Sequence, residues 1–289
     1  MPHIERAGAR IYYETYGHKV GTAPAMVFAH GAGGNHLSWW QQVPHFRGRY
    51  SCVVFDHRGW GLSVGSKEQT AVESKEQTAK SKDEEGGQTA GGGPDGSQFV
   101  EDLRALLDHL EIERATLVAQ SMGGWTSLGF AMRWPERVER LVMCDTHGGI
   151  DTPEIRAAWS QARELAASLP PGAHPACGAR MFREQPEMHF LYTEINDLTP
   201  PRTPDEMRAL IRDAGTLSPA DVASLDMPAL FIAGEEDIVI PPAVIEIASG
   251  YIRDAAIERV PEAGHSVYFE RPSRFNEVVD EFLSRSVNL

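Results

Sequence analysis

The feature that most constrains the fold is a stretch in which a strand-like run meets a helix-like run at a serine and two glycines. Residues 115–120 (ATLVAQ) are apolar enough for a buried strand, and residues 125–134 carry apolar groups at helical spacing. Between them stand Ser121 and, two positions later, Gly123 and Gly124. Glycine within a helix costs roughly 1 kcal/mol relative to alanine, so its presence indicates a turn without room for side chains.

Strand-like and helix-like segments alternate along most of the 289-residue chain. This alternation predicts an α/β fold with a mainly parallel, twisted sheet flanked by helices. The segments expected to form strands are residues 9–17, 24–31, 51–59, 115–120, 138–145, 227–237 and 255–260. The segments expected to form core helices are residues 98–112, the run after Ser121 and residues 272–286.

Strand patterns stop between residues 148 and 225, where proline-punctuated helical segments replace them. This interruption predicts a helical cap inserted between two late strands. The chain would then consist of a core made of residues 1–147 and 226–289 and a cap made of residues 148–225.

A low-complexity segment occupies residues 64–97 within the predicted core. The hexamer Ser-Lys-Glu-Gln-Thr-Ala occurs at residues 66–71 and again at residues 74–79, and a glycine-rich tract follows. With almost no large apolar residues, the segment cannot bury enough surface to offset the entropy of ordering. We expect a disordered or loosely helical insertion, with a lid over an active site as the alternative.

The composition narrows the choice of partners and of location. The chain has 27 Lys and Arg against 41 Asp and Glu, a net charge of −14, which disfavours nucleic acid and anionic membranes as partners. The absence of a signal-peptide-like or membrane-spanning apolar run predicts a cytoplasmic protein. The three cysteines lack metal-site spacing: Cys52 and Cys144 are expected in the core, and the exposure of Cys177 is left open.

The turn at Ser121 resembles the nucleophile elbow of the α/β-hydrolase superfamily, whose usual pattern is Gly-x-Ser-x-Gly. Here Ala119 stands in the first glycine position and Gly123 in the second. The superfamily orders its catalytic residues along the chain as Ser, acid, His. The resemblance therefore implies Ser121 as nucleophile, Asp237 in AGEEDIVIPP as acid and His265 in EAGHSVYFERP as base.

Three other carboxylates compete for the role of the acid. Glu235 and Glu236 directly precede Asp237, and Asp145 follows the strand-like run LVMC at a position where some relatives place the acid. The resemblance favours Asp237, because it stands before the apolar residues and prolines that follow the acid in the superfamily.

The resemblance also implies an oxyanion hole made of backbone N–H groups. One donor would be Met122, which follows the nucleophile, and the other Ala32, in the loop FAHGAGG. His30 and Gly31 would shape that loop. The segment FDHRGWGLS, residues 55–63, matches a further superfamily signature to which we assign a structural role.

The implied function is a serine hydrolase of small carboxylic esters or lactones, without a cofactor or a metal. Its substrate is expected to be a small apolar molecule, with Trp39, Trp125, Phe182 and Tyr192 as pocket candidates. A C–C bond hydrolase of aromatic ring-cleavage products, a cofactor-free perhydrolase and a low-turnover small-molecule receptor remain alternatives. The oligomeric state stays open.

A deletion tests the role of the insertion. Replacing residues 66–93 with a short Gly-Ser linker should leave kcat nearly unchanged, because the segment holds no predicted site residue and a flexible linker can join its ends. The kcat for one aryl ester and the melting temperature are compared between the full and shortened chains. A large fall in kcat at an unchanged melting temperature would identify the segment as a lid.

Overall fold

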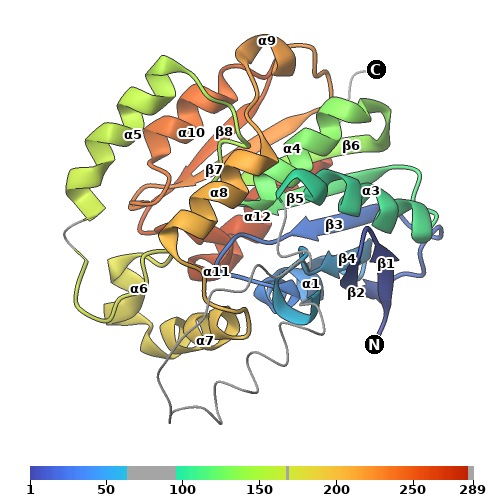
Figure 1. The fold of residues 1–289 in the computed structure, drawn as a ribbon, viewed down its shortest axis with the longest axis horizontal. Coiled ribbons are helices and arrows are strands. Elements are labelled where there is room, and N and C mark those ends of the chain that lie inside the picture. The colour runs from blue at the N-terminus through green and yellow to red at the C-terminus, as the bar shows by residue number, and fades with distance from the viewer. Residues whose placement is uncertain (64–95, 167–168, 286–289) are drawn as a thin grey trace, which may run out of the picture.

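The computed structural model describes residues 1–63, 96–166 and 169–285, which surround a central sheet (Figure 1). The order across this eight-stranded sheet is β1-β2-β4-β3-β5-β6-β7-β8. The strands are β1 (His3–Arg6), β2 (Ala9–Gly17), β3 (Ala25–Ala29), β4 (Ser51–Phe55), β5 (Ala115–Gln120), β6 (Val138–Cys144), β7 (Ala229–Gly234) and β8 (Ala256–Val260). Strands β1, β2 and β4 pair antiparallel, and all pairs from β4 to β8 are parallel.

Helices pack on both faces of the sheet, and its central strands are therefore buried along their whole length. Val27 of β3 faces the cluster that includes residues of α3, α4 and α10, whereas its neighbour Phe28 faces the cluster that includes η1, α1 and α12. The core helices and turns are η1 (His36–Trp39), α1 (Gln42–Phe46), η2 (Gly61–Ser63), η3 (Gly96–Gln98), α3 (Phe99–His109), α4 (Gly123–Arg133), η4 (Pro135–Arg137), α10 (Pro242–Ser249), α11 (Val267–Glu270) and α12 (Pro272–Ser284).

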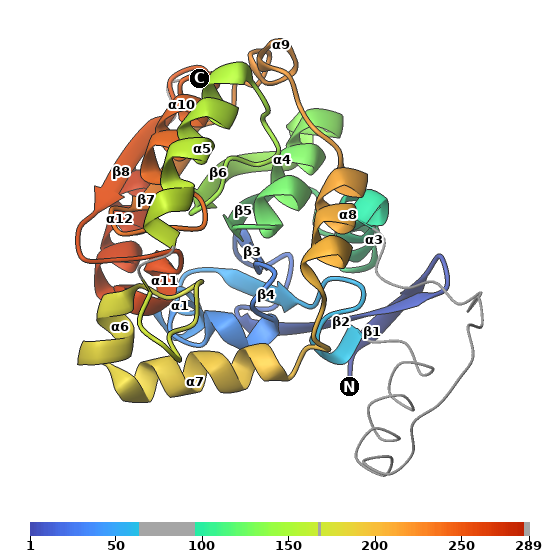
Figure 2. The same ribbon diagram turned by 60° about the vertical axis from the view of Figure 1, so that its left-hand side comes forward.

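The segment between β6 and β7 is helical, as its prolines and lack of strand patterns predict. Its helices are α5 (Pro153–Ala166), α6 (Ala179–Glu184), α7 (Pro186–Asp197), α8 (Pro204–Ala214) and α9 (Pro219–Val222). The two ends of this segment meet in a parallel bridge between Ile150 and Leu217. In Figures 1 and 2, α5 lies beside α10, and α8 lies near the start of α3, where it contacts η3. The expected α/β architecture, a mainly parallel sheet flanked by helices with a helical cap inserted between two late strands, is confirmed, and the limits of core and cap stay predictions.

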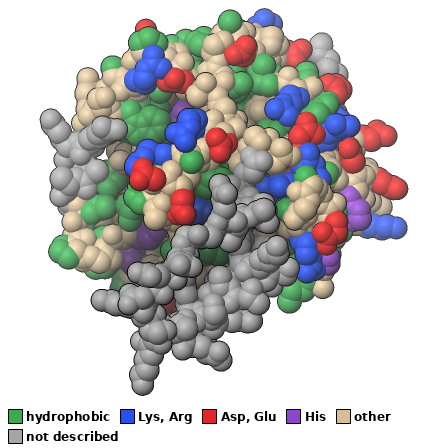
Figure 3. Space-filling model, in the orientation of Figure 1, with side chains coloured by type: hydrophobic (Ala, Val, Ile, Leu, Met, Phe, Trp, Pro, Cys, Tyr) green, Lys and Arg blue, Asp and Glu red, His purple; other side chains and the backbone are tan. Residues whose placement is uncertain are grey.

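The low-complexity insertion lies outside the described residues except for its last two, Gly96 and Ser97, which belong to η3. None of the described helices has both the length and the apolar character needed to cross a membrane. On the face drawn in Figure 3, acidic and basic side chains are intermingled and form no large basic patch. The three cysteines are free thiols and all are buried, which settles the open position of Cys177.

Candidate active site

The turn between β5 and α4 brings a strained serine to the end of a central strand. Ser121 has φ +47°, in the left-handed region that residues with a side chain rarely adopt. A Cβ on Gly123 would lie 2.1 Å from the carbonyl oxygen of Ala29, so only glycine lets α4 approach β3 this closely. A Cβ on Gly124 would lie 2.2 Å from the hydroxyl of Thr146. The glycines that interrupt the sequence pattern are therefore required by close packing around Ser121.

Ser121, His265 and Asp237 form one chain of hydrogen bonds. The Ser121 Oγ and His265 Nε2 atoms are 2.9 Å apart, and His265 Nδ1 lies 2.8 Å from Asp237 Oδ2. Because a carboxylate can only accept, the imidazole carries its proton on Nδ1, and its Nε2 lone pair faces the serine hydroxyl. His265 is 4% exposed and Asp237 is 3% exposed, so both contacts are shielded from water.

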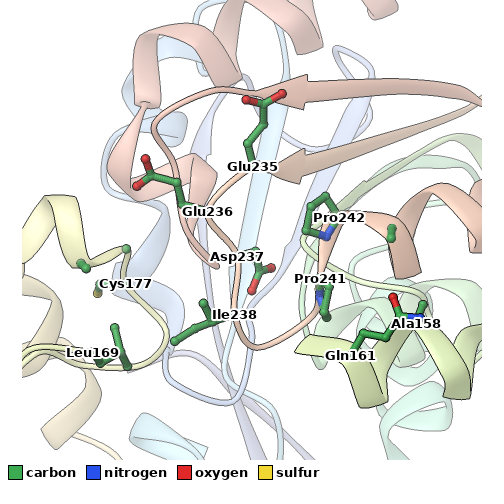
Figure 4. Close-up of a pocket in the computed structure, with 13 residues that line it drawn as sticks. Ala158, Gln161, Leu169, Cys177, Glu235, Glu236, Asp237, Ile238, Pro241 and Pro242 are labelled. Carbon is green, nitrogen blue, oxygen red and sulfur yellow. The ribbon is translucent and has the colours of Figure 1, made fainter. Parts of the chain in front are cut away.

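The loop after β7 fixes the Asp237 carboxylate by hydrogen bonds, and the side chains of its two acidic neighbours point away from it. The other carboxylate oxygen of Asp237 accepts the backbone N–H groups of Val239 at 2.8 Å and Ile240 at 2.9 Å. Figure 4 shows the side chains of Glu235 and Glu236 pointing away from that of Asp237. They form ion pairs with Arg259 and Arg180, respectively. Neither is in a position to orient His265.

Asp145 is close to this chain but bonds to backbone. One carboxylate oxygen accepts the Gly234 N–H at 3.1 Å, and the other accepts the Val267 N–H at 2.9 Å. Burial raises the pKa of the Asp145 carboxyl, and repulsion from Asp237 raises it further. Asp145 therefore ties the end of β7 to the segment that follows His265.

Two opposing influences set the protonation of His265. Burial alone would lower the pKa of its imidazole, but the adjacent carboxylate and hydrogen bond of Asp237 outweigh burial and raise this pKa. The imidazole is neutral, and able to accept a proton, only at pH values above that raised pKa. Any reaction that uses His265 as a base is therefore lost on acidification.

The two predicted oxyanion donors belong to residues that line the cavity of the serine. Ala32 and Met122 line the same cavity as Ser121, and within the described part of the chain neither N–H group donates a hydrogen bond. Such N–H groups are suited to bind a negatively charged oxygen. Within the described residues, both predicted donors are therefore left without a partner, in residues that line the cavity of Ser121.

The histidine of the Ala32 loop is a structural residue by its contacts. His30 Nδ1 donates to the carbonyl of Gly31 at 2.7 Å, and its Nε2 accepts the backbone N–H of His57 at 3.0 Å. Burial lowers the pKa of His30 to about 4, so the ring is neutral. Both ring nitrogens are occupied, and His30 holds the loop in place.

The signature FDHRGWGLS also serves to fix loops. Asp56 is fully buried and accepts hydrogen bonds from the backbone N–H groups of His36 at 2.6 Å and Leu62 at 2.7 Å. Arg58 forms two 2.6 Å hydrogen bonds to the buried carboxylate of Asp102 on α3. These contacts are consistent with the structural role expected of the signature.

A cavity of about 420 Å³ opens over the serine, between the core and the inserted helices. Trp125 and Tyr192 line it, whereas Trp39 and Phe182 do not. Trp39 is fully buried against Phe28 and Tyr268, because η1 turns it into the core. Phe182 packs edge-on against His189 of α7. The expectation of pocket positions for Trp39 and Phe182 is therefore wrong.

Other cavity residues were not singled out by the sequence. They are His174, Pro175, Asn196, Thr199, Arg202, Met207, Ile211, Val239 and Ile240. Arg202 stacks on the ring of Trp60, with its guanidinium carbon 3.8 Å from the ring centroid. Six of the nine lie outside helices and strands, where side-chain directions cannot be derived from a periodic pattern.

A second cavity, of about 480 Å³, lies behind the acid (Figure 4). It is lined by Asp237 and Ile238 on the core side and by Cys177 and Gly178 on the cap side. Neither Ser121 nor His265 lines it. The smaller cavity is therefore the one in which a bound molecule could reach the serine hydroxyl.

Gln120 is a site residue that the sequence reasoning missed. Its side-chain amide donates to the backbone carbonyl of His265 at 2.7 Å, and the residue is 3% exposed. A polar residue at the end of a largely apolar buried strand, next to Ser121, was the signal available.

The described residues contain no group of three or more His, Cys, Asp or Glu side chains arranged to hold a metal ion.

Comparisons with known proteins identify the family and the fold of the chain. The model of the alpha/beta hydrolase family matches residues 26–278. The 3-oxoadipate enol-lactonase 2 of Acinetobacter baylyi is 28% identical over 284 residues, which are 94% of this chain and 92% of that protein. The solved structure of an N-acyl homoserine lactone degrading enzyme has a TM-score of 0.71 and 26% identity, covering 97% of this chain and all of the other. An enol-lactonase from Burkholderia xenovorans LB400, at 23% identity and TM-score 0.71, covers 98% of this chain and all of its own and shares the fold.

The packing at Gly123 predicts that a methyl group added there lowers the free energy of unfolding, whereas a methyl group added at an open glycine does not. Gly123→Ala should destabilise the protein by about 1–3 kcal/mol, because its Cβ meets backbone that cannot give way. Gly48→Ala is the matched control, since nothing lies within 4 Å of the Cβ there. Urea denaturation of both variants gives the two free energies of unfolding. Equal stability of the two variants would contradict the close approach of α4 and β3.

Proposed function

Because the chain belongs to the alpha/beta hydrolase family, we propose that it is a serine hydrolase that cleaves a small carboxylic ester or lactone. The observation that carries the proposal is the hydrogen-bonded chain from Ser121 Oγ through His265 to Asp237, at 2.9 Å and 2.8 Å. A serine hydroxyl is a weak nucleophile unless a base accepts its proton during attack. His265 Nε2 is that base in our proposal.

The reaction begins when Ser121 Oγ attacks the acyl carbon and its proton passes to His265 Nε2. The Asp237 carboxylate fixes the reactive tautomer and stabilises the imidazolium that forms. The substrate carbonyl oxygen becomes an oxyanion, which the N–H groups of Ala32 and Met122 stabilise. The imidazolium then protonates the departing alkoxide, which leaves an ester between the acyl group and Ser121.

Deacylation repeats these steps with water. His265 accepts a proton as water attacks the acyl-enzyme, and the proton returns to Ser121 when the carboxylic acid departs. With a lactone, the alcohol and the acid remain parts of one product. No redox step and no further co-reactant is needed.

The cavity supports a small, largely apolar substrate. Its walls include Met122, Trp125, Trp159 and Tyr192, and a volume of about 420 Å³ accommodates a molecule of modest size. Two relatives at 26% and 28% identity are described by their action on lactones. Lactones therefore belong in the substrate panel beside linear esters.

A substrate panel with one nucleophile variant tests the proposal. The wild-type protein should hydrolyse p-nitrophenyl acetate and butyrate or simple lactones, and Ser121→Ala should lower kcat by at least about a thousandfold. Ser127→Ala on the same helix is the control, because the Ser127 hydroxyl is buried and has no hydrogen-bond partner among the described residues. A fluorophosphonate should label the wild type and the control only. An unlabelled wild type that hydrolyses none of these compounds would refute the proposal.

The assignment of the acid leads to a second comparison. Asp237→Asn should lower kcat by roughly four orders of magnitude, because an amide in place of the carboxylate favours the wrong imidazole tautomer. Asp145→Asn should lower it far less, since that carboxylate bonds to the Gly234 and Val267 N–H groups and not to His265. Both kcat values are measured on one aryl ester. A larger loss for Asp145→Asn would reverse the assignment.

A further inference from the structure

A third buried carboxylate lies beside the base and takes no part in the mechanism described so far. Glu270 ends α11, the four-residue helix that follows the His265 loop, and it is 2% exposed. Burying a carboxylate is costly unless donors replace the water that it loses. The groups that donate hydrogen bonds to the Glu270 carboxylate therefore indicate its role.

All three hydrogen bonds that the Glu270 carboxylate accepts from described residues come from backbone N–H groups. Oε2 accepts from Gly264 at 3.0 Å, and Oε1 accepts from Ser266 at 3.1 Å, so the carboxylate holds the residues on either side of His265. Oε2 also accepts from Gly178 at 3.1 Å, and Gly178 belongs to the segment leading into cap helix α6. One side chain thus binds the cap to the loop of residues 264–266 around His265, which we call the base loop.

The backbones of cap and base loop touch at this point. A Cβ on Gly264 would lie 2.5 Å from the Gly178 nitrogen, and a Cβ on Gly178 would lie 2.7 Å from Glu270 Oε2. Two glycines, one on each side, therefore allow both N–H groups to reach the same oxygen. Additional methyl groups would separate the cap from the loop.

We propose that Glu270 is a positioning residue, which holds the imidazole of His265 in line with Ser121 and couples that alignment to the seating of the cap at Gly178. The proposal rests on the hydrolase function proposed above. Glu270 acts through Gly264 and Ser266 and touches no reacting atom. A misplacement of about 1 Å in a catalytic group can cost on the order of a hundredfold in rate, so a clamp on both neighbours of the base matters to turnover.

The negative charge of Glu270 adds a second, measurable effect. Together with Asp237 and Asp145, its carboxylate raises the pKa of His265 against the effect of burial, which lowers it. The other titratable groups that face this cluster are Cys177, Tyr192 and His174 of the cap and Cys144 and Tyr268 of the core. Removing the charge of Glu270 should therefore lower the pKa of His265, and the acid limb of the pH–rate profile should move to lower pH.

Two substitutions separate the effect of the negative charge of Glu270 from the effect of its side-chain length. Glu270→Gln removes the charge and turns one acceptor into a donor that faces an N–H group. It should lower kcat by about ten- to a hundredfold with KM within about twofold, and move the acid limb to lower pH. Glu270→Asp keeps the charge but is one methylene shorter. It should lower kcat while leaving the acid limb nearer to that of the wild type.

Asp102→Asn is the matched control for stability. Asp102 is also 2% exposed, but its carboxylate pairs with Arg6 and Arg58. This variant should lose stability in urea and keep both kcat and the acid limb at 25 °C. If Glu270→Gln behaves like Asp102→Asn, or if it leaves kcat within twofold and the acid limb unmoved, the proposal is overturned.

Gly178→Ala tests the link to the cap. The methyl group should push the cap segment away from Glu270 and lower kcat although residues 264–270 are unchanged. A separate test of Glu270 needs no substrate. An NMR titration of the His265 ring should give a lower pKa for His265 in Glu270→Gln than in the wild type. If the wild type hydrolysed no compound in the panel, the proposed function would fall, and the titration would still decide whether Glu270 acts on His265. An unchanged titration would overturn the proposal.

Discussion

The parallel register of the sheet is the constraint on which the site depends. β5 pairs in parallel with β3 and β6, β6 pairs with β7, and β7 pairs with β8, so the carboxyl ends of these strands meet at one edge. Ser121, Asp145, Asp237 and His265 follow β5, β6, β7 and β8 in that order. Side chains 144 and 28 residues apart in the sequence thus come within hydrogen-bond distance without any local sequence relation between them.

The base loop is held mainly from its surroundings. Asp237 bonds to the ring of His265, Gln120 to its carbonyl, Asp145 to the N–H of Val267, and Glu270 to the N–H groups on both sides of His265. Three of these four groups are carboxylates buried close together. Burial, and then repulsion from Asp237, raise the pKa of the Asp145 and Glu270 carboxyls, and the three carboxylates together stabilise a positive charge on the imidazole. The arrangement favours the protonated base that forms during proton transfer.

The sequence predicted the elements with a clear period better than the contacts of single side chains. Strand β5 and helix α3 fall within their predicted limits, because each repeats apolar residues over several turns or pleats. Strand β1 was missed, since four residues with charges at two positions carry no recognisable alternation. Trp39 was misassigned because an aromatic residue in a short 3₁₀ turn can face either core or cavity. Glu270 escaped notice because its partners are backbone groups, which no sequence pattern records.

The three buried thiols lie in two different parts of the molecule, the sheet and the cap, and can report on each part to an alkylating probe. Cys52 and Cys144 lie in β4 and β6 with no exposed surface, whereas Cys177 lies in the cap beside Gly178 and is 1% exposed. Burial raises the pKa of each thiol, so none is a reactive thiolate in the folded protein. Alkylation of Cys177 reports separation of the cap from the core, and alkylation of the other two requires the sheet itself to open. The alkylation rate of Cys177 therefore measures opening of the cap, and the alkylation rates of Cys52 and Cys144 measure opening of the sheet.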